Sequence, residues 1–253
     1  MLDNSRINLL GCPIDNLTLD ETLSRINQMV KTNKPHQHVV VNVDKLIKLR
    51  RDPALKEVII TCDIINADGI PLVWASKILG LPLKERVAGI DLMQSLLKEG
   101  VKKRYSFYFL GAREEVVRKT VEIVKNRYPG IQIAGFRNGY WATAEEEKVG
   151  DAIKKAHPDV LFVAISSPKK EIFLKKYLNL MQIPFAIGVG GSFDIIAGIT
   201  KRAPVWMQKA GLEWLFRLIQ EPKRLWKRYL FNNTIFIFVV IKELIKKRIF
   251  RIK

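Results

Sequence analysis

The sequence predicts an α/β fold: a mainly parallel, Rossmann-like sheet flanked by helices, followed by a C-terminal helical appendage of a different character. Up to about residue 200, short apolar runs alternate with segments of helical periodicity. Strands of this kind are buried on both faces, as in parallel sheets. Residues 201–253 then hold 14 Lys and Arg against 3 Asp and Glu, which is most of the net charge of +18. We therefore expect an α/β core over 1–200 and a basic appendage over 201–253.

The core elements follow from apolar periodicity and from turn and cap residues. Thr18 precedes acidic residues as a helix N-cap, and Pro129 with Gly130 ends a helix. The predicted strands are 38–42, 63–66, 106–110, 132–135, 160–165 and 185–189, and the predicted helices are 19–32, 43–50, 53–60, 70–79, 90–100, 114–128, 144–156 and 169–180.

Composition excludes several classes of protein. Cys12 and Cys62 are the only cysteines, and the three histidines are scattered, which predicts a reduced protein with no disulfide, no structural zinc and no metal site. The first 17 residues lack a basic stretch followed by a long apolar run, so we expect no signal peptide and no export.

Polar and glycine residues follow several of the predicted strands, where parallel sheets bind ligands. Asp68 ends one strand beside Gly69 and suits a general base, because glycine lets a substrate approach the backbone. It equally suits a cap for the helix at 70–79. Arg86, in the next loop, could grip a pyrophosphate in a bidentate manner or be a solvated surface charge.

A glycine-rich turn follows the last predicted strand and contains Gly190, Gly191, Ser192 and Asp194. Such a turn can present backbone N–H groups to phosphate oxygens, or it can be a tight packing turn. It matches neither the P-loop pattern nor GxGxxG, and Gly111 after another strand is a weaker signal of the same kind.

The appendage combines cations, aromatic residues and an apolar run. Residues 203–219 predict one amphipathic helix, Glu221 and Pro222 end it, and the run 230–241 is shorter than the ~20 residues of a spanning helix. An interfacial helix on an anionic membrane explains all three features. Nucleic-acid binding would explain the charge but not the apolar run, and an ordinary buried terminal helix is the third possibility.

Two other classes remain as alternatives from the pattern alone. A nicotinamide-dependent oxidoreductase would share the strand–helix alternation, but the sequence lacks an early GxGxxG with an acidic residue ~20 positions later. A nucleic-acid-binding protein would use the basic appendage.

The chain resembles the TagA/WecG/CpsF glycosyltransferase family over nearly its whole length. The match is carried by Asn42, NADG at 66–69, RVAGIDL at 86–92, FLG at 109–111, YPG at 128–130, SPK at 167–169, Glu171, GVGGSFD at 188–194, AG at 197–198, KRAP at 201–204, LEWLFRL at 212–218 and EP at 221–222.

The resemblance implies an inverting, metal-independent transfer without a cofactor. The donor would be UDP-N-acetylmannosamine or the UDP form of a related sugar, and the acceptor N-acetylglucosaminyl-diphospho-undecaprenol. The product would be a disaccharide-lipid for wall teichoic acid or a related surface polymer. The enzyme would be a peripheral protein on the cytoplasmic face of the membrane, without a nucleic-acid partner. The exposed apolar appendage also favours self-association into a homo-oligomer.

The resemblance also implies roles for single residues. Asp68 would be the general base, with Asn42 and Arg86 in the active site and the glycine-rich turn in the donor site. Arg217, Arg224 and the nearby Lys227 and Arg228 would bind diphosphate. The family usually has threonine where this chain has Val40 and glutamine where it has Lys170. Lys170 therefore indicates either an acidic donor sugar, such as a uronic acid, or only a shifted hydrogen-bond pattern.

Overall fold

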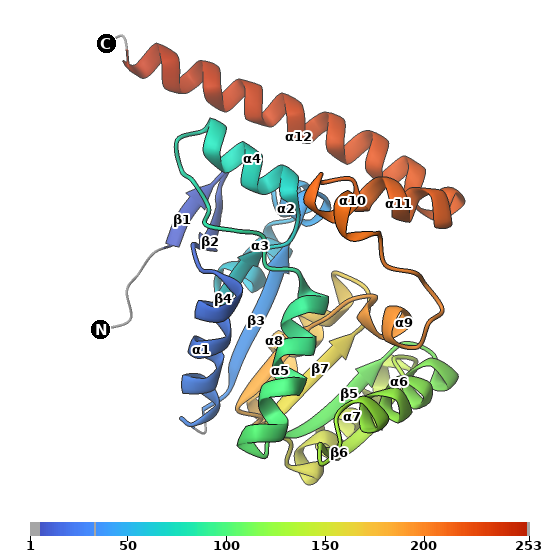
Figure 1. Ribbon diagram of the computed structural model, residues 1–253. Coiled ribbons are helices and arrows are strands. Elements are labelled where there is room, and N and C mark those ends of the chain that lie inside the picture. The colour runs from blue at the N-terminus through green and yellow to red at the C-terminus, as the bar shows by residue number, and fades with distance from the viewer. Residues whose placement is uncertain (1–5, 33, 252–253) are drawn as a thin grey trace.

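The computed structural model describes residues 6–32 and 34–251 (Figure 1). Residues 1–5, 33 and 252–253 lie outside this part, including the last two residues of the expected basic appendage. A six-stranded parallel sheet forms the centre, with strand order β4-β3-β8-β7-β5-β6. Helices cover both of its faces (Figure 1). The predicted α/β class is confirmed.

All six predicted strands are present, with ends that differ by a few residues. They are β3 (His36–Val41), β4 (Ile64–Ala67), β5 (Ser106–Gly111), β6 (Gln132–Arg137), β7 (Val160–Ala164) and β8 (Phe185–Gly188). Every residue of β4, β7 and β8 is buried. Burial on both faces is the reason that these strands appear in the sequence as continuous apolar runs.

A two-stranded antiparallel hairpin at the N-terminal end was not predicted. It consists of β1 (Arg6–Leu9) and β2 (Cys12–Asp15). Its two-residue turn puts Leu10 at φ +54° and Gly11 at φ +87°. Such a turn usually has Asn or Asp before the glycine. Because this chain has leucine there, its sequence does not match the usual pattern of a hairpin turn. Asn8 Oδ1 instead supports the turn by accepting a hydrogen bond from the Gly11 N–H at 2.9 Å.

The predicted core helices are also confirmed, and their bounds position the loops at the strand ends. They are α1 (Leu19–Val30), α2 (Val43–Leu49), α3 (Pro53–Ile60), α4 (Ile70–Ile78), α5 (Gly89–Lys103), α6 (Glu114–Arg127), α7 (Glu146–Ala156) after a short 3-10 turn (Thr143–Glu145), and α8 (Lys169–Met181). A short α9 (Ser192–Ile196) follows the glycine-rich turn. Thr18 is the N-cap of α1 as predicted, and with Glu21 it forms a capping box.

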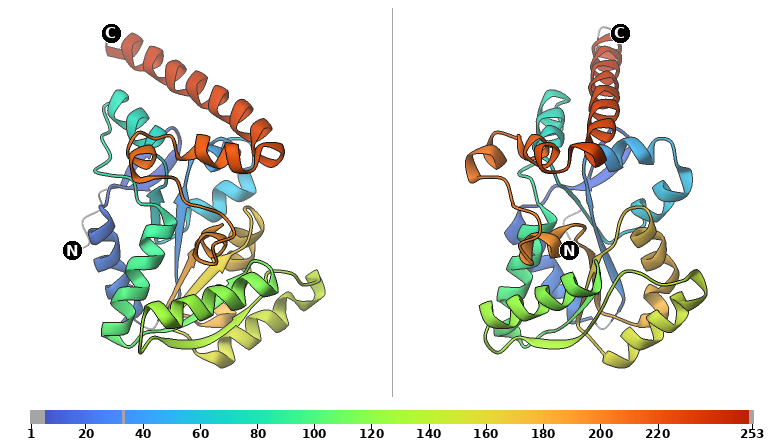
Figure 2. Two further views of the ribbon diagram at one scale, coloured as in Figure 1. Left: turned by 45° about the vertical axis from the view of Figure 1, so that its right-hand side comes forward. Right: turned by 90° about the vertical axis from the view of Figure 1, so that its right-hand side faces the viewer.

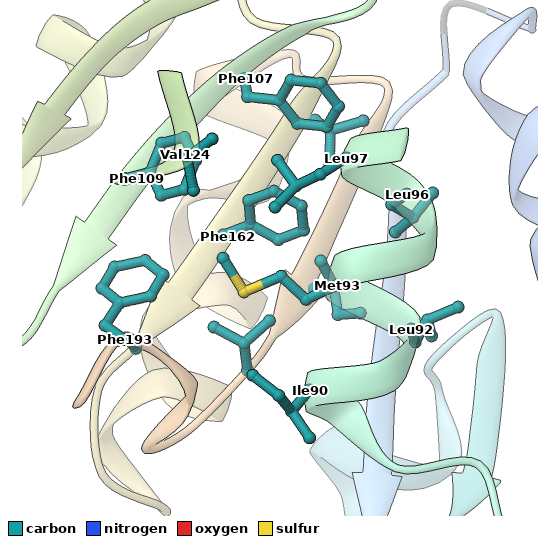
Figure 3. Packing of buried hydrophobic residues seen from close by; sticks show 14 of the residues in the cluster. Ile90, Leu92, Met93, Leu96, Leu97, Phe107, Phe109, Val124, Phe162 and Phe193 are labelled. Carbon is teal, nitrogen blue, oxygen red and sulfur yellow. The ribbon is translucent and has the colours of Figure 1, made fainter. Parts of the chain in front are cut away.

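The largest core cluster lies between one face of the sheet and α1, α5, α6 and α9. Figure 3 shows its centre, where the ring of Phe162 in β7 packs near those of Phe107 and Phe109 in β5. Phe193 of α9 joins the cluster, with its ring centroid 5.6 Å from that of Phe109. Because Phe193 is fully buried, it fixes the glycine-rich turn that precedes it against the sheet.

The segment after residue 200 differs from the prediction. The single helix expected over 203–219 is in fact two, α10 (Val205–Lys209) and α11 (Glu213–Gln220). Gly211 separates them at φ +71°, and a Cβ there would lie 3.0 Å from Ile70 of α4. A left-handed residue in close contact with another helix cannot continue an α-helix. The predicted break at Glu221 and Pro222 is confirmed.

One long helix, α12 (Pro222–Arg251), contains nine basic residues and the apolar run together. Phe236 and Val240 are buried against the cluster that α2, α3 and α4 form with the second face of the sheet. The helix therefore packs on the core along part of its length, and it extends across one end of the molecule (Figure 2). Among the helices that the structure describes, none is long and apolar enough to cross a membrane.

Candidate active site

A large cavity lies at the carboxyl ends of the sheet, and residues that follow all six parallel strands line it. We call it the strand-end cavity. Examples are Asp68 after β4, Arg113 after β5, Ser167 after β7 and Gly190 after β8. Its lining side chains comprise eight Lys or Arg and five Asp or Glu, so the cavity favours an anionic ligand.

A second, smaller cavity lies between the first turn of α4, the start of α11 and α12. We call it the α4–α12 cavity. Ile70, Pro71, Trp214 and Tyr229 give part of its wall an apolar character. Six residues line both cavities: Asn42, Asp44, Asp68, Glu213, Arg217 and Arg228. The two cavities therefore meet at Asp68.

Asp68 is partly buried at the end of β4, where its backbone N–H donates to the Val41 carbonyl at 2.7 Å. The helix-cap interpretation finds no support, because Gly69 is the N-cap of α4 and no side chain of the described residues caps it. Burial raises the pKa of the Asp68 carboxyl, Arg86 lowers it and Glu213 raises it. A desolvated carboxylate facing both cavities has the properties of a general base.

Arg86 belongs to a chain of ion pairs beside Asp68 and is not a solvated surface charge. Its Nη1 lies 2.8 Å from Oε2 of Glu213 in α11, and its Nη2 lies 3.6 Å from Oδ2 of Asp91 in α5. Glu213 also pairs with Arg217 at 3.3 Å. Arg202 binds Asp91 with both terminal nitrogens, at 2.5 and 2.7 Å. The chain joins the segment after residue 200 to the core at Asp68.

Asn42 ends β3 and serves as the N-cap of α2, where its Oδ1 accepts the Lys45 N–H at 2.9 Å. This bond fixes the side chain and leaves its Nδ2 at the junction of the two cavities. A neutral donor beside Asp68 can orient a substrate hydroxyl or a sugar oxygen.

The glycine-rich turn lines the strand-end cavity with backbone. Gly190 has φ +55°, and no described atom lies within 4 Å of the place where its Cβ would be. Ser192 uses its hydroxyl within the turn, donating to the Val189 carbonyl at 2.6 Å. Asp194 also lines the cavity; burial raises its pKa and nearby Arg224 lowers it.

Gly111 packs within the sheet, unlike the glycines of the glycine-rich turn. Its Cβ would lie 2.4 Å from the Ala164 carbonyl oxygen, so a packing requirement of the sheet explains this glycine. Within the described part of the chain Gly111 does not line either cavity, whereas its neighbour Ala112 lines the strand-end cavity.

Lys170 belongs to a buried charge cluster in the wall of the strand-end cavity. Glu171 Oε1 lies 2.8 Å from Lys45 Nζ and 3.3 Å from Lys170 Nζ, so two lysines share one carboxylate. Burial and the charge of Lys45 lower the pKa of Lys170 to about 8, against the opposing effect of Glu171. The cluster therefore carries a surplus positive charge at neutral pH.

Of the four appendage cations expected to bind diphosphate, some line the cavities and one is exposed. Arg217 and Arg228 line both cavities, and Arg224 lines the strand-end cavity. Lys227 is exposed, and its Nζ lies 5.5 Å from the centroid of the Trp226 ring. The structure thus brings three of the four predicted tail residues to the cavities.

Sequence reasoning gave no separate role to several residues of the site. Glu213, Asp91 and Arg202 belong to the ion-pair chain. The pairs Arg86–Glu213 and Arg202–Asp91 join residues that are far apart in sequence, so no local pattern reveals them. Tyr140 and Trp141 follow β6 and line the strand-end cavity, where Lys169 lies over the Trp141 ring at 5.0 Å. Their position after a strand end was the available signal.

Comparison with known proteins supports a glycosyltransferase site. The family model described as "Glycosyl transferase WecG/TagA/CpsF family" matches residues 7–249. The chain belongs to this family. Members are glycosyltransferases, which agrees with the enzyme class expected from the sequence. The match extends from the hairpin to residue 249 in α12, so it includes the segment after residue 200.

Three curated relatives carry one name, N-acetylglucosaminyldiphosphoundecaprenol N-acetyl-beta-D-mannosaminyltransferase. The Bacillus spizizenii protein is 39% identical over 198 residues, covering 78% of this chain and 76% of the relative. The Bacillus subtilis protein is 36% identical over 210 residues, covering 83% and 80%. The protein of Staphylococcus aureus strain MW2 is 31% identical over 242 residues, covering 95% and 94%.

Proposed function

We propose that this glycosyltransferase moves N-acetylmannosamine from UDP to N-acetylglucosaminyl-diphospho-undecaprenol, with inversion and without a metal ion. The reaction of the named relatives supports the sugar and the acceptor. The single observation that carries the mechanism is the position of Asp68 where the two cavities meet. The product would be a lipid-linked disaccharide for wall teichoic acid or a related polymer.

The two cavities suit two substrates. The strand-end cavity takes the UDP-sugar, because it is cationic, lies at the carboxyl ends of a parallel sheet and offers the Gly190–Gly191 backbone to phosphate oxygens. The aromatic faces of Tyr140 and Trp141 can stack on the uracil base. The α4–α12 cavity takes the acceptor sugar, since it reaches Asp68 from the side of the long helix.

Asp68 then acts as the general base. The acceptor 4-hydroxyl attacks the anomeric carbon from the face opposite to UDP. Asp68 takes the hydroxyl proton as the new C–O bond forms, and the electron pair of the breaking C–O bond leaves with the diphosphate. Asn42 holds the reacting oxygen in place.

Arginines stabilise the negative charge that develops on the departing UDP. Arg86, Arg217 and Arg228 line the cavities beside Asp68, and Arg224 lines the strand-end cavity. Fixed guanidinium groups in a partly desolvated site stabilise a diphosphate in the way that a bound cation does elsewhere. Because Arg217, Arg224 and Arg228 come from α11 and α12, the appendage completes the site.

We also propose a peripheral position on the cytoplasmic face of the membrane. The lipid-linked acceptor requires contact with a membrane, and α12 carries nine basic residues against one acidic residue. Exposed Phe231 and Phe238 add apolar contacts to this charge.

One observation favours a second donor class. Lys170 places a buried surplus charge in the wall of the strand-end cavity. A carboxylate on the donor sugar would neutralise that charge, so a UDP-uronic acid is the alternative donor.

A donor panel tests both candidates. Purified enzyme is incubated with a diphospholipid analogue of the acceptor and with UDP-N-acetylmannosamine, UDP-N-acetylglucosamine or an N-acetylated UDP-uronic acid, and products are identified by mass. We expect the mannosamine donor to be used by the parent and by Lys170→Gln. If only the uronic acid is transferred, and Lys170→Gln loses it, the second candidate replaces the first. If no donor is transferred, the proposed reaction is wrong.

A further inference from the structure

Two helices besides α12, namely α4 and α10, each carry a pair of large exposed apolar side chains. Trp74 and Ile78 of α4 are 50% and 59% exposed. Val205 and Trp206, which begin α10, are 64% and 63% exposed. Single exposed apolar residues are ordinary, but two pairs on neighbouring helices form a patch that needs a partner.

Contacts place α4 between α10 and α12. On one side, a Cβ on Gly211, just after α10, would lie 3.1 Å from the Trp74 ring. On the other side, Lys247 of α12 donates to the Leu79 carbonyl at the end of α4, at 2.7 Å. The views agree that all three helices lie at the same end of the molecule (Figures 1 and 2).

The long helix contributes a stripe to this end. Phe231, Phe238, Ile241 and Ile245 are exposed and recur at helical spacing, so they share one face. Phe236 and Val240 belong to a different face, which is buried on the core. The long helix therefore has two apolar faces. One packs on the core, and the other, which carries Phe231 and Phe238, has no partner among the described residues.

Cations accompany the apolar side chains. Lys77 is the only charged residue of α4 and Lys209 the only one of α10, while Glu243 is the only acidic residue of α12. Aromatic and aliphatic side chains bordered by Lys and Arg match the boundary between anionic headgroups and acyl chains. Tryptophan is especially suited to that boundary.

We propose that α4 and α10 form a single membrane-binding surface with α12, and that its partner is an anionic lipid bilayer. The core itself then contacts lipid through Trp74 and Ile78, next to the Ile70–Pro71 wall of the α4–α12 cavity. This orientation brings that cavity to the headgroup layer. This proposal depends on the proposed function only where it assigns the α4–α12 cavity to a lipid-linked acceptor.

The test measures binding to vesicles of phosphatidylcholine with phosphatidylglycerol, at several salt concentrations, using the full chain. Two double variants, W74S/I78S and V205S/W206S, remove the patch. Ile172→Ser is the control, because Ile172 is 52% exposed but lies on α8. Each double variant should bind about tenfold more weakly, as expected for losing one to two inserted apolar side chains. The control should bind like the parent.

Fluorescence provides a second measurement that depends less on folding of the variants. Brominated lipids quench tryptophan that enters the bilayer, so W74F and W206F should each remove quenchable emission. Trp141, in the strand-end cavity, should contribute emission that the lipid does not quench. Parent-like binding of both double variants, or no quenching of Trp74 and Trp206, overturns the membrane-binding surface.

The membrane-binding surface and the proposed transfer reaction can be refuted separately. Transfer to a short-chain, water-soluble acceptor should be the same in the parent and in W74S/I78S, because neither residue lines a cavity in the described structure. Loss of vesicle binding with retained transfer supports the surface. Absence of transfer in the parent refutes the proposed function and leaves the binding result standing.

Discussion

At the scale of single residues, Asp68 is expected to lower the stability of the fold and is proposed to act as the general base. Burial raises its pKa, so ionised Asp68 makes the folded protein less stable at pH values above that raised pKa. Asp68→Asn removes this charge. We expect turnover to fall by about 10²–10⁴-fold. The melting temperature should also rise, because the variant no longer buries a charge whose ionised form burial disfavours. Near-normal turnover of this variant would rule out the base.

The pH dependence of turnover reports on the neighbours of Asp68. A base must be ionised, so activity is lost as pH falls through the raised pKa of Asp68. Glu213 raises that pKa, and it also holds Arg86 at 2.8 Å. Glu213→Gln should therefore move the acid limb of kcat/KM to lower pH, because one negative charge is lost. An acid limb that stays in place or moves to higher pH contradicts this electrostatic assignment.

At the scale of elements, the two faces of α12 should respond differently to the same substitution. Phe236 is 6% exposed and packs on the core, whereas Phe238 is 68% exposed. Phe236→Ala should lower the melting temperature by ~10 °C, because truncating a buried phenylalanine costs about 3–5 kcal/mol. Phe238→Ala should leave it unchanged. Equal effects in thermal unfolding would mean that α12 does not pack on the core as described.

The strands and core helices were predictable because burial on both faces leaves apolar runs and helical periodicity in the sequence. The location of Asp68, Asn42 and Arg86 at the cavities was predictable because these residues follow strand ends or match family motifs, and their roles stay predictions. The Leu10–Gly11 hairpin was not, because its turn has leucine where asparagine is usual. The separation of α10 from α11 at Gly211 was not predictable either, because it depends on contact with Ile70 and Trp74. Long-range pairs such as Arg202–Asp91 leave no local pattern.

At the scale of the whole molecule, the appendage lines both cavities and is joined to the core by long-range contacts. Glu213 and Arg202 pair with core residues Arg86 and Asp91, and Asn232 of α12 donates to Asp44 at 2.7 Å. Both partners of that last pair line the α4–α12 cavity. The proposed acceptor site therefore forms only when α11 and α12 lie on the core, close to the surface proposed to bind lipid. This coupling would limit turnover to the membrane that holds the acceptor.

The most direct test concerns how the enzyme stabilises the departing nucleotide. Formation of the disaccharide-lipid from UDP-N-acetylmannosamine is followed in excess EDTA, and again after adding magnesium or manganese. If the arginines beside Asp68 stabilise the leaving diphosphate, the rate in EDTA equals the rate with either metal. A rate that collapses in EDTA and returns with magnesium or manganese would show that a bound cation does this work.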